Sequence, residues 1–315
     1  MTEMASTRVA FGEALRDLAR SGYDVVAVTA DTSKSMCVDL LAREFPERWI
    51  DAGVAEQNMM MIAAGLAATG KIAFASSYSV FTSMRCCEQL RTFVAYPFLN
   101  VKVVAGLGGL TAGIEGVTHV AIEDLGIVRC IPNLTILNPS DATTAWMSVK
   151  AAADWPGPVY IRLGRDASPV IFDHNYKFEI GKSVMHREGD DVALIASGLI
   201  LFEALNASDL LAKEGIGVSL LEVHTLKPLD KERLLDIAQR TKAVVTVEEH
   251  SIIGGLGSAV AEVLSENCPV IMERMGIKDT FSESGTPEEL RQKYGLTSQN
   301  IAETVKKILR KKGSI

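Results

Sequence analysis

Short, almost wholly apolar runs alternate along the chain with longer stretches in which apolar residues recur at helical spacing. The apolar runs are typical of buried β-strands and lie at residues 24–29, 71–75, 101–105, 134–137 and 159–162. The stretches between them predict helices at residues 11–20, 55–68, 84–95 and 142–153. Continuous apolar strands that alternate with helices predict an α/β fold, in which a parallel sheet is covered by helices on both faces.

The alternation pauses at two polar stretches, with a short hairpin-like piece between them; the stretches are residues 171–177 and 187–191. It resumes with apolar runs at residues 192–196, 218–223 and 243–247, and the chain closes with a basic amphipathic helix predicted at residues 298–312. We therefore predict two doubly wound domains, residues 1–175 and 190–315, joined by a linker at residues 176–189.

Composition narrows the class of protein. The hydrophobic fraction of 48% and the charged fraction of 23% are typical of a soluble globular chain. A formal net charge of −7 offers no basic excess for the phosphates of nucleic acid. There is no apolar run long enough to span a membrane and no signal-peptide pattern, and the five cysteines lack metal-binding spacing. These features predict a cytoplasmic protein that binds neither nucleic acid nor membrane.

One ionisable side chain, Glu56, heads the helix predicted at residues 55–68. Spacing alone leaves two interpretations open: a first-turn acid that favours the helix dipole, or a buried general acid/base. Because Met59, Met60 and Met61 leave the helix apolar all round, burial is favoured.

The segment after the strand at residues 71–75 carries a second candidate feature. Tyr78, Phe81 and Met84 recur every three residues, at a carboxyl end of the sheet where open α/β folds bind ligands. They could line one wall of a flat pocket, or pack in the core at the start of a helix.

The loop after the strand at residues 101–105 contains five glycines between residues 106 and 116. Such a loop can bring its backbone close to a ligand. His119 lies near its end, four residues after Glu115. A lone histidine is more often structural, but one in a glycine-rich loop at the end of a strand is a candidate for catalysis or substrate binding.

A second glycine-rich run, Gly254-Gly255-Leu256-Gly257, superficially resembles a dinucleotide-binding turn. Val260 stands where the third glycine would be expected, and no βαβ unit with a suitably placed acidic residue follows. A tight turn into a helix is the better interpretation.

Together, the motif Gly53-Val54-Ala55-Glu56-Gln57, the aromatic positions and the glycine loop resemble the thiamine-diphosphate enzymes of the transketolase superfamily. The resemblance runs from about Thr7 to the C-terminus and implies a pyrimidine-binding domain followed by a transketolase C-terminal domain. The family's Gly-Asp-Gly motif with a downstream Asn, which holds magnesium, is missing from the sequence. The chain is thus similar to the C-terminal subunit of a split transketolase, whose N-terminal partner subunit would bind the diphosphate and Mg²⁺.

The resemblance implies how the cofactor would be held. Glu56 would hydrogen-bond N1′ of the aminopyrimidine and so help to remove the proton from thiazolium C2. The other cofactor-binding residues would be Asp31, Tyr78, Phe81 and Met84. The family often has an aromatic residue where Met84 stands.

The resemblance also implies the substrate-binding residues, which are Arg8, Ser35, Glu115, His119 and Arg165. The arginines suit a sugar phosphate because the guanidinium fork matches phosphate oxygens, although surface ion pairing would be the default interpretation without the resemblance. His119 would also be catalytic, near the reacting carbon. Glu115 replaces a family aspartate that reads a substrate hydroxyl, and an upstream family histidine falls on or near Leu107-Gly108.

The leading hypothesis is transfer of a two-carbon ketol unit from a ketose phosphate to an aldose phosphate, by a dimer of this chain with two partner chains. A decarboxylating relative is one alternative, either 1-deoxyxylulose-5-phosphate synthase-like or the beta subunit of a 2-oxoacid dehydrogenase. A split transketolase specialised for other sugars is another. A non-catalytic subunit that only stabilises its partner is the third.

Overall fold

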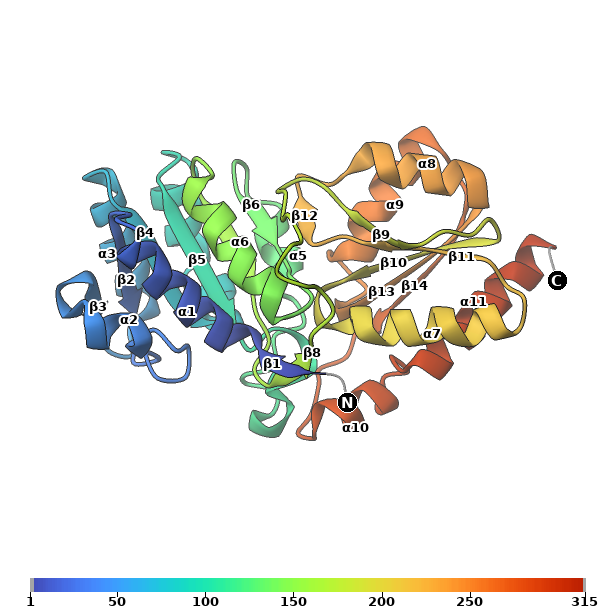
Figure 1. The fold of residues 1–315 in the computed structure, drawn as a ribbon, viewed down its shortest axis with the longest axis horizontal. Helices are drawn as coiled ribbons and strands as arrows, with labels where there is room; N and C mark the ends of the chain where they lie inside the picture. The colour runs from blue at the N-terminus through green and yellow to red at the C-terminus, as the bar shows by residue number, and fades with distance from the viewer. Residues whose placement is uncertain (1–2, 314–315) are drawn as a thin grey trace.

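A seven-stranded sheet forms the first part of the computed structural model, which describes residues 3–313. Its strand order is β12-β6-β7-β5-β4-β2-β3 (Figure 1). The strands are β2 (Val25–Thr29), β3 (Trp49–Asp51), β4 (Ile72–Tyr78), β5 (Val101–Gly106), β6 (Thr135–Leu137), β7 (Val159–Arg162) and β12 (Thr225–Lys227). Every neighbouring pair is parallel except β12 with β6. Because β2, β5, β6 and β7 are buried at every position, the predicted doubly covered parallel sheet is confirmed.

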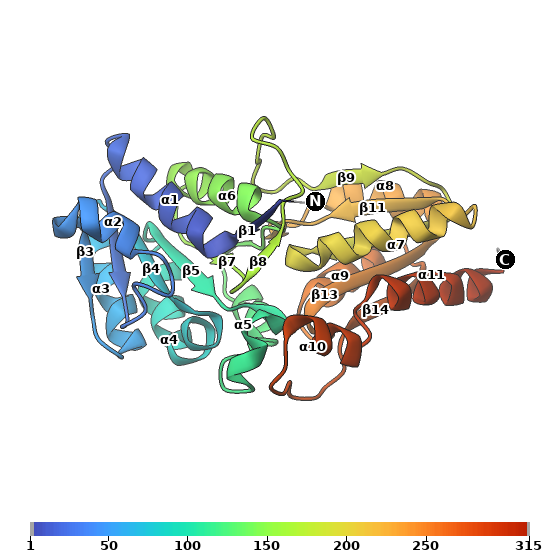
Figure 2. The same ribbon diagram turned by 60° about the horizontal axis from the view of Figure 1, so that its bottom comes forward.

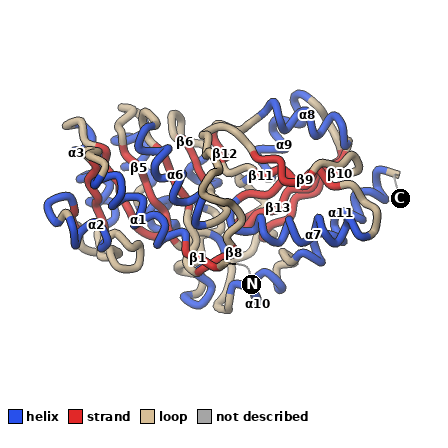
Figure 3. Tube along the Cα trace, viewed as in Figure 1, coloured by secondary structure: helices blue, strands red, loops and turns tan. Residues whose placement is uncertain are grey.

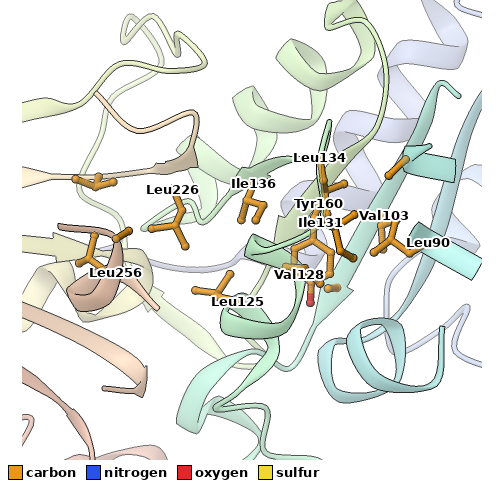
Figure 4. Close-up of a cluster of buried hydrophobic side chains, with 14 of the residues drawn as sticks. Leu90, Val103, Leu125, Val128, Ile131, Leu134, Ile136, Tyr160, Leu226 and Leu256 are labelled. Atoms are coloured by element: carbon orange, nitrogen blue, oxygen red, sulfur yellow. The ribbon is translucent and has the colours of Figure 1, made fainter. Parts of the chain in front are cut away.

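Helices cover both faces of this sheet. They are α1 (Thr7–Arg20), α2 (Asp39–Glu44), α3 (Glu56–Ala68), α4 (Cys87–Gln89), α5 (Asp124–Arg129) and α6 (Ala142–Asp154). On one face α1 and α6 pack with apolar side chains such as Phe11 and Val149. On the other face α3 and α5 pack with Met59 and Val128. This second cluster continues to Leu226, on β12 of the same sheet, and to Leu256, in the second half of the chain (Figure 4).

The helix predicted at residues 84–95 is not a regular one. Two wide helical turns, Phe81–Arg85 and Leu90–Ala95, flank the single turn of α4. The amide of Cys86 donates to the carbonyl of Phe81, five residues earlier, at 3.3 Å. Such wide turns often occur at functional sites.

A five-stranded sheet, whose strands are red in Figure 3, forms the second part. The strand order is β14-β13-β10-β11-β9. Its strands are β9 (Val184–Arg187), β10 (Val192–Ser197), β11 (Val218–Glu222), β13 (Ala243–Ser251) and β14 (Ile271–Ile277). Only β9, the edge strand, is antiparallel to its neighbour. The prediction of a hairpin-like piece between the two polar stretches was therefore wrong. The strand in that segment is β9, and it pairs with β11 and not with a strand next to it in the sequence.

The helices of the second part are α7 (Leu201–Lys213), α8 (Lys231–Thr241), α9 (Leu256–Asn267), α10 (Pro287–Lys293) and α11 (Ser298–Lys312). Helix α11 has the bounds predicted for the closing helix, and it packs beside α7 on one face of the sheet (Figure 2). None of the helices within residues 3–313 has the length and apolar character needed to cross a bilayer.

The two parts of the molecule are joined by strand pairing and by hydrogen bonds. Strand β12 comes from the second half of the chain but completes the first sheet. A small antiparallel pair, β1 (Met4–Ser6) and β8 (Ala167–Pro169), joins the start of the chain to the segment after β7. The Nζ atom of Lys227, at the end of β12, donates to the carbonyls of Arg129 at 3.0 Å and Ile131 at 2.5 Å.

Candidate functional site

The residues singled out from the sequence gather around the carboxyl ends of the strands in the first sheet. Tyr78 ends β4, the loop with His119 follows β5, and Arg165 follows β7. Glu56 begins α3 a few residues after β3. In open parallel sheets this edge is where ligands bind.

Three rings form the wall that the sequence predicted only in part. The ring centroids of Tyr78 and Phe81 lie 5.8 Å apart. The His119 imidazole lies 5.8 Å from the Tyr78 ring and 5.3 Å from the Phe81 ring, edge-on to the latter. The structure thus adds the His119 ring to the Tyr78–Phe81 pair. Met84, which was expected to be the third residue of this wall, is 43% exposed.

Glu56 is buried at the start of α3, with 5% of its surface exposed. The interpretation as a buried acid, rather than a solvated helix cap, agrees with this position. Its two carboxylate oxygens accept hydrogen bonds from Nη1 of Arg85 at 2.9 and 3.0 Å. The guanidinium carbon of Arg85 also lies 3.9 Å from the centroid of the Phe81 ring. A planar cation therefore fills the space between Glu56 and the aromatic wall.

Sequence reasoning did not identify Arg85 as a functional residue. A signal was available, because Arg85 follows Phe81 by four residues, which places both side chains on one face of a helical turn. The pairing with Glu56, 29 residues earlier, depends on tertiary structure and could not be read from spacing.

Asp51, at the end of β3, is a second residue that the sequence reasoning missed. Its Oδ1 accepts the backbone N–H of Asp31 at 2.9 Å and of Gly53 at 2.8 Å, and its Oδ2 accepts the Thr29 hydroxyl at 3.2 Å. Asp31 and Gly53 both have positive φ, 57° and 69°. One carboxylate therefore fixes the loop that carries Asp31 and the loop that leads to Glu56.

A polar cluster lies beyond the aromatic wall and contains most of the predicted substrate residues. Ser35 Oγ lies 2.9 Å from Tyr78 Oη. Arg8 donates to the carbonyl of Arg165 through Nε at 2.9 Å and through Nη2 at 2.6 Å, and to the carbonyl of Ser35. Burial lowers the pKa of Arg8 below its ordinary value, because desolvation penalises the charged form.

The second arginine of this cluster, Arg165, is paired with carboxylates. Its Nε lies 3.0 Å from Glu115 Oε1, and its Nη1 lies 3.2 Å from Asp166 Oδ1. These pairs are partly open to solvent, so an anionic ligand can compete with them. The side chain of Asp31, which was expected to bind the cofactor, is exposed.

The glycine loop after β5 contacts the second part of the molecule closely. A Cβ atom at Gly109 would lie 2.8 Å from Glu249 Oε2, and one at Gly113 would overlap the Gly285 carbonyl oxygen. At these two positions the missing side chain lets the loop pack against the second part of the molecule, a use that the sequence did not predict. The loop reaches the site through His119 and Glu115.

The glycine-rich run near residue 254 is a turn into α9, as predicted. Gly254 has a φ of 86°. The first amides of α9 donate to the carboxylate of Glu248, Leu256 N to Oε2 at 2.6 Å and Gly257 N to Oε1 at 2.8 Å. Burial raises the pKa of Glu248. Because a side-chain carboxylate already occupies this helix N-terminus, it does not offer a phosphate site.

Within residues 3–313, no group of three or more histidine, cysteine, aspartate or glutamate side chains is placed to hold a metal ion. The groups that the site offers to a ligand are a buried carboxylate that accepts hydrogen bonds, a wall of two aromatic rings, an imidazole beside this wall, and two arginines near a serine hydroxyl.

Comparison with known protein families gives two matches along the chain. The family model described as the transketolase pyrimidine-binding domain matches residues 3–170. The family model described as the transketolase C-terminal domain matches residues 181–301.

Individual relatives match over nearly their whole length. The chain is 43% identical to the 6-deoxy-6-sulfo-D-fructose transketolase subunit SqwH of Clostridium sp. (strain MSTE9), over 97% of this chain and 95% of that protein. It is 36% identical to an apulose-4-phosphate transketolase subunit of Phocaeicola vulgatus, over 98% of this chain and 99% of that protein. A solved structure described as a split gene transketolase, inactive beta4 tetramer, superposes with a TM-score of 0.90 at 45% identity, covering 97% of this chain and 98% of that one.

Proposed function

This chain belongs to the transketolase family, and we propose that it is the C-terminal subunit of a split transketolase. In this role it transfers a two-carbon ketol unit from a ketose phosphate to an aldose phosphate, together with an N-terminal partner subunit. The observation that carries the proposal is the Glu56 carboxylate, which is buried at the head of α3 and faces the Phe81 ring across a planar N–H donor.

The residues present fit the aminopyrimidine of thiamine diphosphate. The Glu56–Phe81 slot holds a flat group that donates N–H to the carboxylate and lies against the ring. An aminopyrimidine presents the same features, a planar face and polar atoms at its edge. When bound, thiamine diphosphate supplies the carbon nucleophile that the reaction requires.

The chain's own residues would then divide the work. Glu56 would hold a proton at N1′ of the pyrimidine, while Tyr78 and Phe81 would orient the ring and exclude water. Met84 and Asp31 would flank the cofactor. His119, against both rings, would move protons of the substrate's hydroxyl groups. We assign the Mg²⁺ ligands to the partner subunit.

The polar cluster would bind the charged end of the sugar. Arg8, Ser35 and Arg165 present two guanidinium groups and a hydroxyl, which match the oxygens of a phosphate. Arg165 would exchange its pairs with Glu115 and Asp166 for the ligand, and Glu115 would then be free to read a substrate hydroxyl. A sulfonate, such as the one in the sugar named for the Clostridium relative, is also an oxyanion that this cluster could hold.

The assembly we propose is a dimer of this chain with two partner chains. The structural relative supports the need for a partner subunit, because that protein is described as a beta4 tetramer, built from one kind of subunit, and as inactive. The exposed apolar side chains Ile114 and Val117, at 62% and 46% exposure, lie in the loop that leads to His119 and would be covered in such an assembly.

The test combines the chain with its N-terminal partner, thiamine diphosphate and Mg²⁺, and measures ketol transfer between a ketose phosphate and an aldose phosphate. We expect Glu56→Gln to lower the rate by about 10²- to 10⁴-fold, because a neutral amide cannot hold the N1′ proton as the carboxylate does. Glu47→Gln, at an exposed surface position, is the matched control and should retain full activity.

Three outcomes would contradict the proposal. Full activity of Glu56→Gln would remove the catalytic assignment. Turnover by the chain without its partner would contradict the split site. Decarboxylation of a 2-oxo acid in place of ketol transfer would favour the decarboxylating alternative.

A further inference from the structure

Arg85 has no role in the proposed reaction, yet it makes the closest contacts to the residue on which that reaction depends. Its Nη1 donates to both oxygens of Glu56, at 2.9 and 3.0 Å, and its guanidinium carbon lies 3.9 Å from the Phe81 centroid. The Arg85 side chain is 50% exposed, whereas the Glu56 side chain is 6% exposed. The guanidinium therefore closes the slot from the solvent side.

The two contacts of this guanidinium are those proposed for the aminopyrimidine. Both groups are planar, both present N–H groups to a carboxylate, and both lie on the face of an aromatic ring. Glu56 has little open surface for a second partner. Arg85 and the cofactor ring therefore compete for one place.

We propose that Arg85 is an internal, displaceable ligand of the cofactor slot, which occupies the space between Glu56 and Phe81 until the pyrimidine displaces it. This inference rests on the proposed function, because it requires that the slot receives thiamine diphosphate. It adds a residue that sets the affinity for the cofactor and the rate at which the cofactor enters.

The surroundings of Arg85 allow its side chain to leave while its backbone stays. The carbonyl of Arg85 accepts a hydrogen bond from Gln57 Nε2 at 3.1 Å, which anchors the backbone to α3. The hydrogen bond between Cys86 N and Phe81 O, at 3.3 Å, holds the wide turn on which both slot residues lie. Rotation of the half-exposed side chain toward solvent breaks neither of these bonds.

While Arg85 occupies the slot, only a fraction of the molecules can bind the cofactor. The apparent dissociation constant equals the intrinsic one divided by that fraction, so removing the occupant tightens binding. Because the ion pair is partly exposed and therefore weak, we expect a modest factor. Salt screens such a pair, so the factor should shrink as ionic strength rises.

The experiment titrates thiamine diphosphate into the chain assembled with its N-terminal partner and Mg²⁺, and follows binding by calorimetry and the association rate by stopped-flow fluorescence. We expect Arg85→Ala to bind the cofactor about 3- to 10-fold more tightly and to associate faster. Arg85→Lys keeps the charge but lacks the planar fork, so it should lie between Arg85→Ala and the unaltered chain. Arg91→Ala removes an exposed arginine from the same segment and is the matched control.

Unchanged or weaker binding by both Arg85 variants would overturn the inference, since it would mean that Arg85 does not compete or that it helps to bind the cofactor. The proposed function fails separately, through a fully active Glu56→Gln. A variant set in which Glu56→Gln is inactive and Arg85→Ala binds like Arg91→Ala would overturn only the role of Arg85. Circular dichroism of each variant confirms that the fold is intact.

Discussion

Two arginine–carboxylate pairs in this molecule have the same length and opposite surroundings. Arg85 lies 2.9 Å from Glu56, and Arg162 lies 2.9 Å from Asp124. The Arg85 side chain is 50% exposed, but those of Arg162 and Asp124 are 6% and 0% exposed. Contact distance therefore says little about what a pair does; access of water and the number of further partners decide it.

The buried pair belongs to a network that spans both sheets. Arg162 Nη2 also donates to the carbonyl of Ala121 at 2.8 Å and to that of Glu249, on β13, at 3.2 Å. Asp124 also accepts the Tyr160 hydroxyl at 3.2 Å. Burial raises the pKa of Tyr160 well above its ordinary value, so this hydroxyl remains a donor. With its partners satisfied inside the protein, this pair fixes the relation between the two sheets.

The largest effect should come from breaking the buried pair. Arg162→Met leaves the Asp124 carboxylate in the interior without its cation, and we expect a loss of about 3–5 kcal/mol in the free energy of unfolding. Urea denaturation at fixed chain concentration measures it, with the exposed Arg43→Ala as control. If Arg162→Met were as stable as the unaltered chain, the network would not stabilise the contact between the two sheets.

Another buried cation, Lys102, sharpens the comparison because its partners are carbonyls and not a carboxylate. Its Nζ donates to the carbonyls of Trp155 and Gly157, each at 2.7 Å. Burial lowers the pKa of Lys102 to about 7. Above that pH the folded chain holds fewer protons at this site than the unfolded chain, whose lysine titrates near 10.5. Stability from this group must therefore rise with pH.

The expected rise is about 1–2 kcal/mol between roughly pH 7 and pH 8.5. Lys102→Met removes the titrating group, so the difference in free energy of unfolding between the two chains should change by this amount over the same interval. Urea denaturation at several pH values gives both curves. If the free energies of unfolding of the two chains changed in parallel with pH, Lys102 would have the ordinary pKa of an exposed lysine.

Asp51 offers an exposed carboxylate that binds N–H and O–H groups in place of a cation. Asp51→Ala removes three hydrogen bonds from the loops before Glu56, and we expect a loss of about 1 kcal/mol in stability with weaker cofactor binding. Asp51→Asn keeps an acceptor for the two amides and should lie closer to the unaltered chain. Equal cofactor affinity in all three proteins would show that the loops hold their shape without this carboxylate.

The smallest effect on stability should come from the pair whose arginine is half-exposed. Arg85→Ala is expected to change the free energy of unfolding by less than about 1 kcal/mol, because removing the guanidinium opens the solvent side of the slot and lets water solvate Glu56. The same urea series used for Arg162→Met provides the measurement. A loss as large as that of Arg162→Met would make both pairs structural and would remove the contrast between them.

The sequence predicted the parts of the fold that depend on burial of apolar side chains. Strands such as β5 and β7, which are buried at every position, produce continuous apolar runs that can be recognised without structural information. Strands β3 and β12 have three residues each and carry no such signal. The irregular turns at residues 81–95 also escaped, because apolar spacing does not distinguish a wide helical turn from a regular one.

The candidate site divides in the same way. Glu56, Tyr78, Phe81 and His119 could be selected because motif, spacing and strand order placed them at one edge of the sheet. Arg85 and Asp51 could not, because their importance lies in partners that folding brings to them from other segments. Hydrogen bonds between residues that are far apart in the sequence produce no periodic pattern from which they could be predicted.

Strand β12 has a consequence for any attempt to treat the two halves as exchangeable modules. It is an antiparallel edge strand of the first sheet, yet it lies between β11 and α8 of the second part. A fragment ended in the segment between the sheets would expose β6 as a bare edge, with unpaired backbone groups beside the apolar Ile136 and Leu137. Chimeras made by recombination with other members of this family should therefore keep residues 134–137 and 225–227 from the same parent.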